Sequence, residues 1–195
     1  MIWNGSKGRI ACFVYLLAVF SAKAQSNTVP EAQQADLLLK VMNYDRAMSK
    51  RSEDVIRIGI IYNEANTESM STWEKVGDSL FDLIAAGKKV GNKKITFSGL
   101  QYTTESGLEQ MASSLGVAVF YVMPGNTQNL QAISNVAKRI GVLTYSGVKE
   151  YIANGVASGV EMVEGKAKIV IHLPKAKEQG ASFRAELLKL ARVIQ

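Results

Sequence analysis

Few residues in this chain have side chains that could act as nucleophiles or transition-metal ligands. His172 is the only histidine among 195 residues, and Cys12 is the only cysteine. Catalysis of the Ser-His-Asp or Cys-His type needs a histidine that an acid orients, and a zinc-type site needs several Cys, His or carboxylate ligands. His172 lies in the strand-like segment KIVIHL, and nothing in the sequence pairs it with an acid. We therefore expect no catalytic residues, no metal and no cofactor.

The carboxylates show no spacing that selects a pair for general acid–base catalysis. The candidates fall in predicted loops or at predicted strand ends: Glu64, Glu68, Glu105 and Glu161. A solvated surface position is the default for such residues. A hydrolase therefore has no signature in this sequence, and we expect the protein not to be an enzyme.

One segment superficially resembles a phosphate-binding loop. In GVEMVEGK, five residues separate Gly159 from Gly165, whereas the motif requires four, and Ala167 stands where a Ser or Thr would hold magnesium. The segment also lies between two strand-like stretches, which favours a hairpin. The first predicted strand is followed by NEANTES, so the glycine-rich dinucleotide fingerprint is missing as well.

Polar residues follow each of the first four predicted strands, and they form a candidate ligand rim. In an open parallel sheet, the carboxyl ends of the strands meet at one edge, where ligands bind when there is one. Residues of these types are also usual in ordinary loops and helix caps, which is the interpretation we favour. The candidate rim residues are Asn63, Thr103, Asn126 and Ser146.

Residues 1–24 have the features of a cleavable signal peptide. Lys7 and Arg9 precede an apolar run from Ile10 to Phe20, and small residues lead to a cleavage site after Ala24. Removing this segment leaves 20 basic residues against 17 acidic ones, a net charge of +3 rather than +6. An exported chain of this charge does not suit nucleic-acid binding. We expect no direct membrane insertion after cleavage, and no cysteine remains.

The rest of the chain predicts a polar tail over residues 25–30 and a single α/β domain over residues 31–195. An apolar content of 47% with only three prolines excludes a disordered chain. Strand-like and helix-like segments alternate from residue 55 to residue 145, which indicates a three-layer fold with a mostly parallel sheet and helices on both faces. An antiparallel hairpin at one edge is expected from residues 156–163 and 168–173.

The first and last predicted helices carry a candidate partner surface. The first helix, which begins after Pro30, has an apolar stripe of Leu37, Val41, Tyr44 and Met48. The closing helix has a core stripe of Phe183, Leu187, Leu190 and Ile194. Leu188 and Val193 lie off that stripe, which predicts either burial on two sides or a contact with a partner. The candidate partner surface comprises Tyr44, Arg46, Arg184, Leu188, Arg192 and Val193.

The tail of the chain resembles the YfiR/HmsC-like family of periplasmic proteins. The resemblance rests on GVASGV (155–160), KIVIHL (168–173), KAKEQGA (175–181) and the closing FRAELLKLARVI run, with weaker support from Tyr44-Asp45-Arg46 and from residues 57–62. It implies a small periplasmic α/β regulator. Its best-understood relatives repress a membrane-bound diguanylate cyclase, and so control biofilm formation through cyclic-di-GMP signalling, whereas others accompany sensor kinases or outer-membrane receptors. His172 and Arg184 depart from the family's usual Asn and Ser.

The resemblance also implies the kind of partner. It would be the periplasmic segment of an inner-membrane signalling protein, and a homodimer is possible. Relatives that sense redox state use cysteine pairs, which this exported chain lacks. The alternative is a small-ligand binding lobe resembling half of a periplasmic solute-binding protein, because IRIGIIY and VAVFYVM follow that βαβ pattern. Such receptors usually close two lobes on a ligand, and this chain has length for one.

Overall fold

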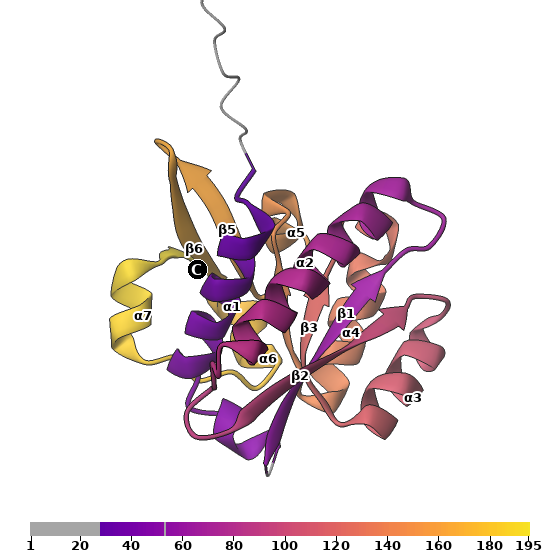
Figure 1. The fold of residues 1–195 in the computed structure, drawn as a ribbon, viewed down its shortest axis with the longest axis horizontal. Helices are drawn as coiled ribbons and strands as arrows, with labels where there is room; N and C mark the ends of the chain where they lie inside the picture. The colour runs from indigo at the N-terminus through magenta and orange to yellow at the C-terminus, as the bar shows by residue number, and fades with distance from the viewer. Residues whose placement is uncertain (1–27, 53) are drawn as a thin grey trace, which may run out of the picture.

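A seven-stranded sheet organises the chain in the computed structural model, which describes residues 28–52 and 54–195 (Figure 1). The predicted signal peptide lies outside the described residues. The strand order is β2-β1-β3-β4-β5-β6-β7, and only the β5–β6 pair is antiparallel. The strands are β1 Val55–Tyr62, β2 Lys94–Gln101, β3 Val117–Val122, β4 Leu143–Ser146, β5 Ser158–Val163, β6 Lys166–His172 and β7 Arg192–Ile194.

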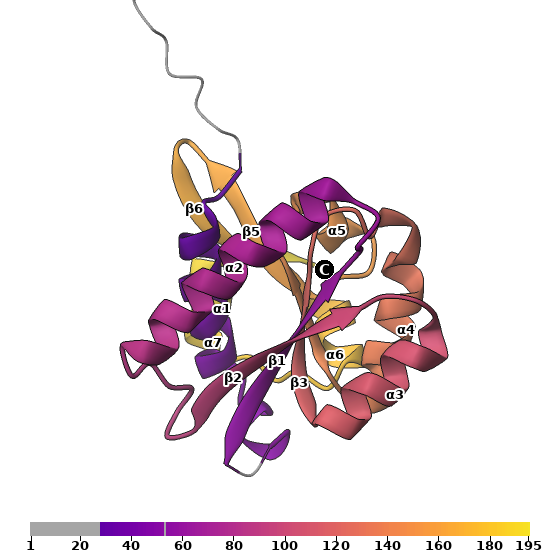
Figure 2. The ribbon, with the colours of Figure 1, turned by 45° about the vertical axis from the view of Figure 1, so that its right-hand side comes forward.

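Helices cover both faces of the sheet (Figures 1 and 2). One apolar cluster packs α1 and α2 against the sheet, and a second packs α3 and α4 against the opposite face. All six residues of β3 are buried, as expected of a central strand covered on both sides. The predicted α/β class is confirmed. The helices are α1 Glu31–Tyr44, α2 Thr67–Ala85, α3 Glu105–Leu115, α4 Leu130–Ile140, α5 Lys149–Ala153, α6 Leu173–Glu178 and α7 Ala185–Leu190, with 3-10 turns at Met48–Lys50 and Thr127–Asn129.

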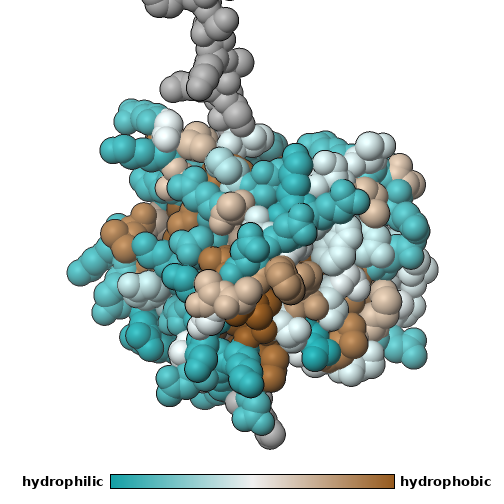
Figure 3. Space-filling view, in the orientation of Figure 1, coloured by the Kyte–Doolittle hydropathy of each residue, from teal (hydrophilic) through white to brown (hydrophobic). Residues whose placement is uncertain are grey.

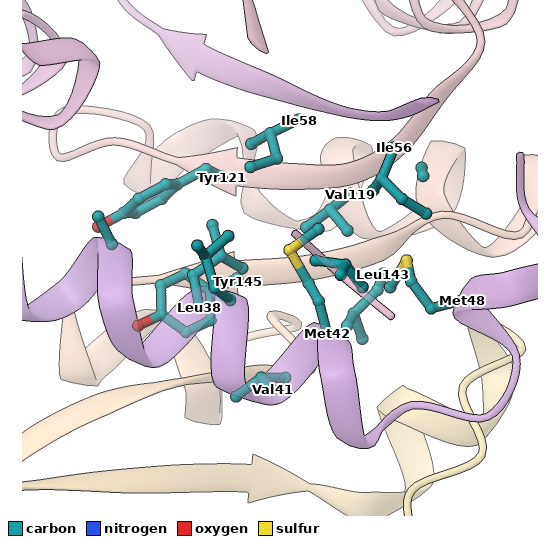
Figure 4. Packing of buried hydrophobic residues seen from close by; sticks show 14 of the residues in the cluster. Leu38, Val41, Met42, Met48, Ile56, Ile58, Val119, Tyr121, Leu143 and Tyr145 are labelled. Carbon is teal, nitrogen blue, oxygen red and sulfur yellow. The ribbon is translucent and has the colours of Figure 1, made fainter. Parts of the chain in front are cut away.

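Part of the apolar stripe predicted for the first helix is displaced by one residue in the structure. The fully buried residues of α1 include Leu38, Val41 and Met42, whereas Leu37 is only half-buried. In Figure 4, Leu38 and Met42 point from α1 toward the sheet, where Val119 and Tyr121 lie. The spacing of apolar residues locates a stripe on a helix, but it does not determine which residues at the margin of that stripe contact the sheet.

The closing helix predicted from Phe183 to Ile194 is wrong in its extent. Helix α7 spans only Ala185–Leu190, and residues 192–194 form β7, which pairs in parallel with β6. Ala191 has an extended backbone conformation that ends the helix. The edge of β6 offers unpaired backbone groups, and the β-branched Val193 and Ile194 suit a strand that satisfies them. Of the predicted stripe, Leu190 is 57% exposed.

A buried cation joins segments that lie far apart in the sequence. Arg51 Nη1 donates to the carbonyl oxygen of Gly141 at 2.6 Å, and its Nη2 donates to that of Gln179 at 3.0 Å. Asp45 Oδ2 lies 3.5 Å from Arg51 Nη2, and both side chains are buried. The other Asp45 oxygen accepts the backbone N–H of Ser182 at 2.8 Å. The end of α1, the turn after α4 and the segment after α6 are therefore held at one point.

A second ion pair attaches β7 to the hairpin. Arg192 donates to both carboxylate oxygens of Glu161 on β5, at 2.5 and 3.0 Å. Lys149 Nζ lies 3.4 Å from the same carboxylate. Glu161 is only 4% exposed, so its expected solvated position is wrong. The hydrogen bonds from Arg192 hold the pKa of Glu161 below its ordinary value, although burial acts in the opposite direction.

Replacing Arg51 by Met should destabilise the domain strongly. Removal of one partner from a buried ion pair leaves the other charge uncompensated, which costs about 3–5 kcal/mol. Arg51→Met also leaves the carbonyls of Gly141 and Gln179 without this donor. Urea denaturation measures the change in the free energy of unfolding. The matched control is Arg139→Met, because Arg139 pairs with Glu105 and Glu109 on the surface. Equal midpoints for the two variants would contradict the role assigned to Arg51.

Glu161→Gln should cost stability at neutral pH and progressively less in acid. A carboxylate whose folded pKa is lowered contributes stability above its unfolded pKa and loses that contribution as the pH falls through the folded pKa. The free energies of unfolding of the wild type and the variant should therefore converge below the ordinary value of 4.5. Chemical denaturation from pH 7 to pH 3 measures both. A difference that does not change with pH would contradict this account.

Candidate functional site

Two of the candidate rim residues meet at the carboxyl ends of β1 and β3. Asn63 Nδ2 donates to the carbonyl oxygen of Gly125 at 3.0 Å. The fully buried Asn126 donates from Nδ2 to the carbonyl of Met123 at 3.1 Å, and its backbone N–H donates to the hydroxyl of Tyr151 at 3.0 Å. Both amides therefore bind the protein's own loops.

The other two rim residues lie at the ends of β4 and β2. Ser146 is buried, and its hydroxyl donates to the carbonyl of Val122 at 2.7 Å and accepts the N–H of Val148 at 3.1 Å. Thr103 is exposed beyond β2. Three of the four rim side chains thus hold backbone groups in place, which is the role expected of loop and cap residues. The rim orders the loops around a neighbouring cavity.

That cavity has a volume of about 630 Å³ and lies at the carboxyl end of the central strands. It is bounded by the start of α1, the first turns of α2, the loops after β3 and β4, and the middle of β5. None of the four candidate rim residues lines it. Its polar lining includes Gln34, Tyr121, Glu68, Lys149, Glu150 and Glu161.

The floor of the cavity is a fixed hydrogen-bond network around Gln34. Tyr121 donates its hydroxyl to Gln34 Oε1 at 2.6 Å, and Gln34 Nε2 donates to the carbonyl of Val29 at 2.6 Å. Tyr145 donates to the backbone carbonyl of Gln34 at 2.8 Å. Burial raises the pKa of Tyr121 and of Tyr145 well above the ordinary value, so both phenols stay protonated donors. Gly147 fits against Gln34, because a Cβ there would lie 1.8 Å from Oε1.

Sequence reasoning did not find these lining residues. Gln34 lies on the buried side of a helix whose stripe was read from apolar residues only. Glu161 was expected in solvent, yet its two basic partners come from β7 and from α5. The only sequence feature that indicated a buried carboxylate was the position of Glu161 within the apolar stretch GVEMV. Partners that are distant in the sequence leave no local pattern.

The lining of this site mixes charged, polar and apolar groups. Its lining carries glutamates, one lysine, amide and phenol groups together with apolar surface from Val122, Met123 and Met162. Among the described residues, no group of three or more His, Cys, Asp or Glu side chains is placed to hold a metal ion. His172 Nδ1 accepts the backbone N–H of Lys175 at 3.4 Å and caps α6.

The candidate partner residues lie where α1 and the C-terminal segment meet. We call this region the α1–α7 surface; it comprises Tyr44, Arg46, Arg184, Leu188, Arg192 and Val193. Arg46 donates its backbone N–H to Ser182 and Arg184 donates to Tyr44, both at 2.9 Å, so the two segments are joined directly. Helix α7 lies beside α1 (Figure 1). Arg192 and Val193 lie in β7.

Burial differs among the members of the α1–α7 surface. Arg46, Arg184 and Arg192 are exposed, whereas Tyr44 and Leu188 are half-buried and pack against the core. The first two arginines line a depression of about 280 Å³. The most exposed apolar side chain of α7 is Leu190, which the sequence assigned to the core. Within residues 28–52 and 54–195, no helix is both long and apolar enough to cross a membrane.

Three solved structures share this fold at low sequence identity. The ABC domain from Streptococcus pneumonia, solved with L-Trp, aligns at a TM-score of 0.60 and 15% identity over 85% of this chain and 60% of its own. A conserved domain protein from Vibrio cholerae O1 biovar eltor gives 0.59 and 14%, covering 87% and 62%. The substrate binding protein CD0873 from Clostridium difficile gives 0.55 and 16%, covering 87% and 61%. The chain thus spans about three fifths of these proteins.

The family comparison agrees with the features of the C-terminal segment. Comparison with curated proteins gave no match. A family model described as YfiR/HmsC-like matches residues 31–192, which includes every helix and nearly every residue of the sheet. The resemblance read from the closing residues is thereby confirmed. The chain belongs to the YfiR/HmsC-like family.

Proposed function

We propose that this chain is a non-catalytic periplasmic regulator that binds the periplasm-facing segment of an inner-membrane signalling protein. A diguanylate cyclase or a sensor kinase is the type of partner that the family suggests, and repression is the expected effect. Membership of the YfiR/HmsC-like family supports this proposal. The lining chemistry described above, which contains binding groups rather than a nucleophile with its base, supports a function in binding.

The observation that carries the proposal is a pair of free cations on the α1–α7 surface. Within the described part of the chain, no ion pair or side-chain hydrogen bond engages the guanidinium of Arg46 or of Arg184. Both line the 280 Å³ depression. An exposed arginine makes two parallel hydrogen bonds to a carboxylate, and arginines are enriched where interfaces gain most of their affinity.

Apolar surface near these cations supplies the rest of a binding region. Leu190 is 57% exposed on α7, and Leu188 is half-buried on the same helix. A partner segment that combines acidic side chains with apolar ones would satisfy the arginines and cover the leucines. Such a mixture of a desolvated apolar centre and charged rim is the usual anatomy of a protein interface.

Reversing the charges of Arg46 and Arg184 should strongly weaken capture of the partner. Arg46→Glu together with Arg184→Glu places like charges opposite an acidic segment, and we expect recovery from solubilised membranes to fall about tenfold or more. Mass spectrometry must identify the captured protein as a cyclase or kinase with a periplasmic segment. The matched control is Lys166→Glu with Lys168→Glu on the exposed hairpin. Full capture by the arginine variant, or capture of no signalling protein, would overturn the proposal.

The cavity favours a second candidate function, which is binding of a small ligand. Its volume of about 630 Å³ is in the range of small-molecule sites, and its lining mixes apolar surface with fixed polar groups. The structural relatives include a protein solved with L-Trp and a substrate binding protein. A regulator that also binds a ligand would be compatible with both sites, because they use opposite ends of α1.

Thermal melting against a panel of metabolites tests this second function. A ligand at 100 times its Kd stabilises the folded state by about 2.7 kcal/mol, which raises the Tm by roughly 5–10 °C. Thr72 lines the cavity from α2, so Thr72→Phe should remove the shift. Ser79→Phe on the same helix lies outside the lining and should retain it. The candidate fails if no compound shifts the wild type, or if both variants respond equally.

A further inference from the structure

The connection between α2 and β2 carries a run of lysines with no acidic residue among them. Residues 86–94 read AGKKVGNKK, which places Lys88, Lys89, Lys93 and Lys94 within seven positions. Lys88, Lys89 and Lys94 are exposed. Within residues 28–52 and 54–195, no ion pair or hydrogen bond engages the ammonium groups of these three lysines. Their charges therefore have no partner in this part of the chain.

The turn that carries these lysines is fixed by hydrogen bonds. Val90, which is buried, and Lys93 exchange backbone hydrogen bonds at 3.2 and 3.1 Å. Between them, Gly91 has a φ of 58°, in the left-handed region that glycine adopts without strain. Asn43 of α1 accepts the backbone N–H of Gly91 at 2.8 Å and donates to the carbonyl of Lys89 at 3.3 Å. The turn is thereby attached to the end of α1, which keeps its lysines in one arrangement.

Further cations lie beside this turn on neighbouring segments. Lys93 Nζ donates to the carbonyls of Ser49 and Ser52, so its charge lies next to the turn that follows α1. Lys93 also lines the depression of about 280 Å³ together with Arg46 and Arg184. Figure 3 shows hydrophilic residues at the lower left of this side of the molecule, where the α2–β2 connection lies in Figure 1. We call this region the basic face; it comprises Arg46, Lys88, Lys89, Lys93, Lys94 and Arg184.

The carboxylates around the basic face do not balance its charge. Asp45 lines the same depression, but it is buried and paired with Arg51. Among the described residues, the exposed carboxylates that flank these segments in the chain are Asp54, Asp82 and Glu186, which makes three against six cations. The basic face therefore has an excess of positive charge, and a binding partner must supply the negative charge.

Lysines in this arrangement suit an extended negative surface. An ammonium group is a compact point charge that attracts phosphate without a fixed orientation, whereas arginine recognises a carboxylate through two parallel hydrogen bonds. Four of the six cations are lysines, and Val90, the apolar residue of the turn, is buried, so the turn offers no side chain for insertion into lipid. Clusters of four to eight Lys or Arg residues attract proteins to anionic phospholipids. An exported chain meets such a surface at the inner membrane.

We propose that the basic face docks on the anionic phospholipid surface of the inner membrane, without insertion into the bilayer. Arg46 and Arg184 belong both to the basic face and to the α1–α7 surface. Docking therefore places the α1–α7 surface beside the bilayer, where the periplasmic segment of a membrane protein begins. The docking itself needs no signalling partner, so protein-free vesicles test it separately from the capture proposed above.

Sedimentation of the chain from residue 25 onward with phospholipid vesicles tests the docking. Vesicles of phosphatidylcholine with about 30% phosphatidylglycerol should retain the protein at low salt, whereas pure phosphatidylcholine should not. Raising the salt concentration from about 50 to about 300 mM should lower the partition coefficient about tenfold, because exposed charges are screened. Each lysine beside such a surface contributes about fivefold, so Lys88→Gln, Lys89→Gln and Lys94→Gln together should lower it about 100-fold. Circular dichroism should show that this triple variant folds, since all three side chains are exposed.

A second triple variant separates the basic face from the net charge of the chain. Lys166→Gln, Lys168→Gln and Lys177→Gln remove the same charge from exposed positions on β6 and α6, and should leave most of the binding intact. A wild type that does not bind the anionic vesicles, or equal binding by the two triple variants, would overturn the proposal. Loss of vesicle binding in millimolar inorganic phosphate at constant ionic strength would also overturn it, because the lysines would then bind a free anion. Binding to poly-glutamate but not to vesicles would have the same consequence, since it would assign the basic face to an acidic protein segment.

Discussion

The buried guanidinium of Arg51 is the constraint on which the arrangement of the chain ends depends. It bonds to carbonyls at the end of α4 and after α6, and its partner Asp45 holds Ser182. A buried charge of this kind is costly unless it is paired and hydrogen-bonded. Its partners come from three distant segments, so compensation of the charge requires the arrangement in which these segments meet. The α1–α7 surface exists only in that arrangement, since its residues are separated by more than a hundred positions.

Helix α1 connects the two regions to which we assign binding. Its first turns contribute Glu31 and Gln34 to the cavity, and its last residue, Tyr44, belongs to the α1–α7 surface. Gln34 is held by Tyr121 and Tyr145 from neighbouring strands, so the start of the helix is positioned by hydrogen bonds as well as by apolar packing. Its other end is positioned by Asp45. The same helix thus carries a fixed polar contact at each end.

Local sequence patterns predicted most of the fold, because helix caps and the spacing of apolar residues depend on residues that are close in the sequence. The alternation of strand-like and helix-like segments from residue 55 to residue 145 is confirmed, and within it α3 has local signals at both ends, a Thr104 cap and a left-handed Gly116. β7 was missed because Ile194 fits the predicted helical stripe as well as a three-residue strand, and only the pairing with the neighbouring β6 decides between the two. The burial of Glu161 and Gln34 was missed for a related reason. Their partners lie 31 and 87 residues away, and a periodicity search does not detect such pairs.

The most direct test of the account is hydrogen–deuterium exchange of the exported chain with and without the periplasmic segment of the signalling protein that it captures. We predict that this segment slows exchange in residues 44–46 and 182–194, where the α1–α7 surface lies. No change in these residues, or slowed exchange confined to the cavity around residues 147–150 and 160–162, would contradict the claim that this protein acts by binding a signalling partner through that surface.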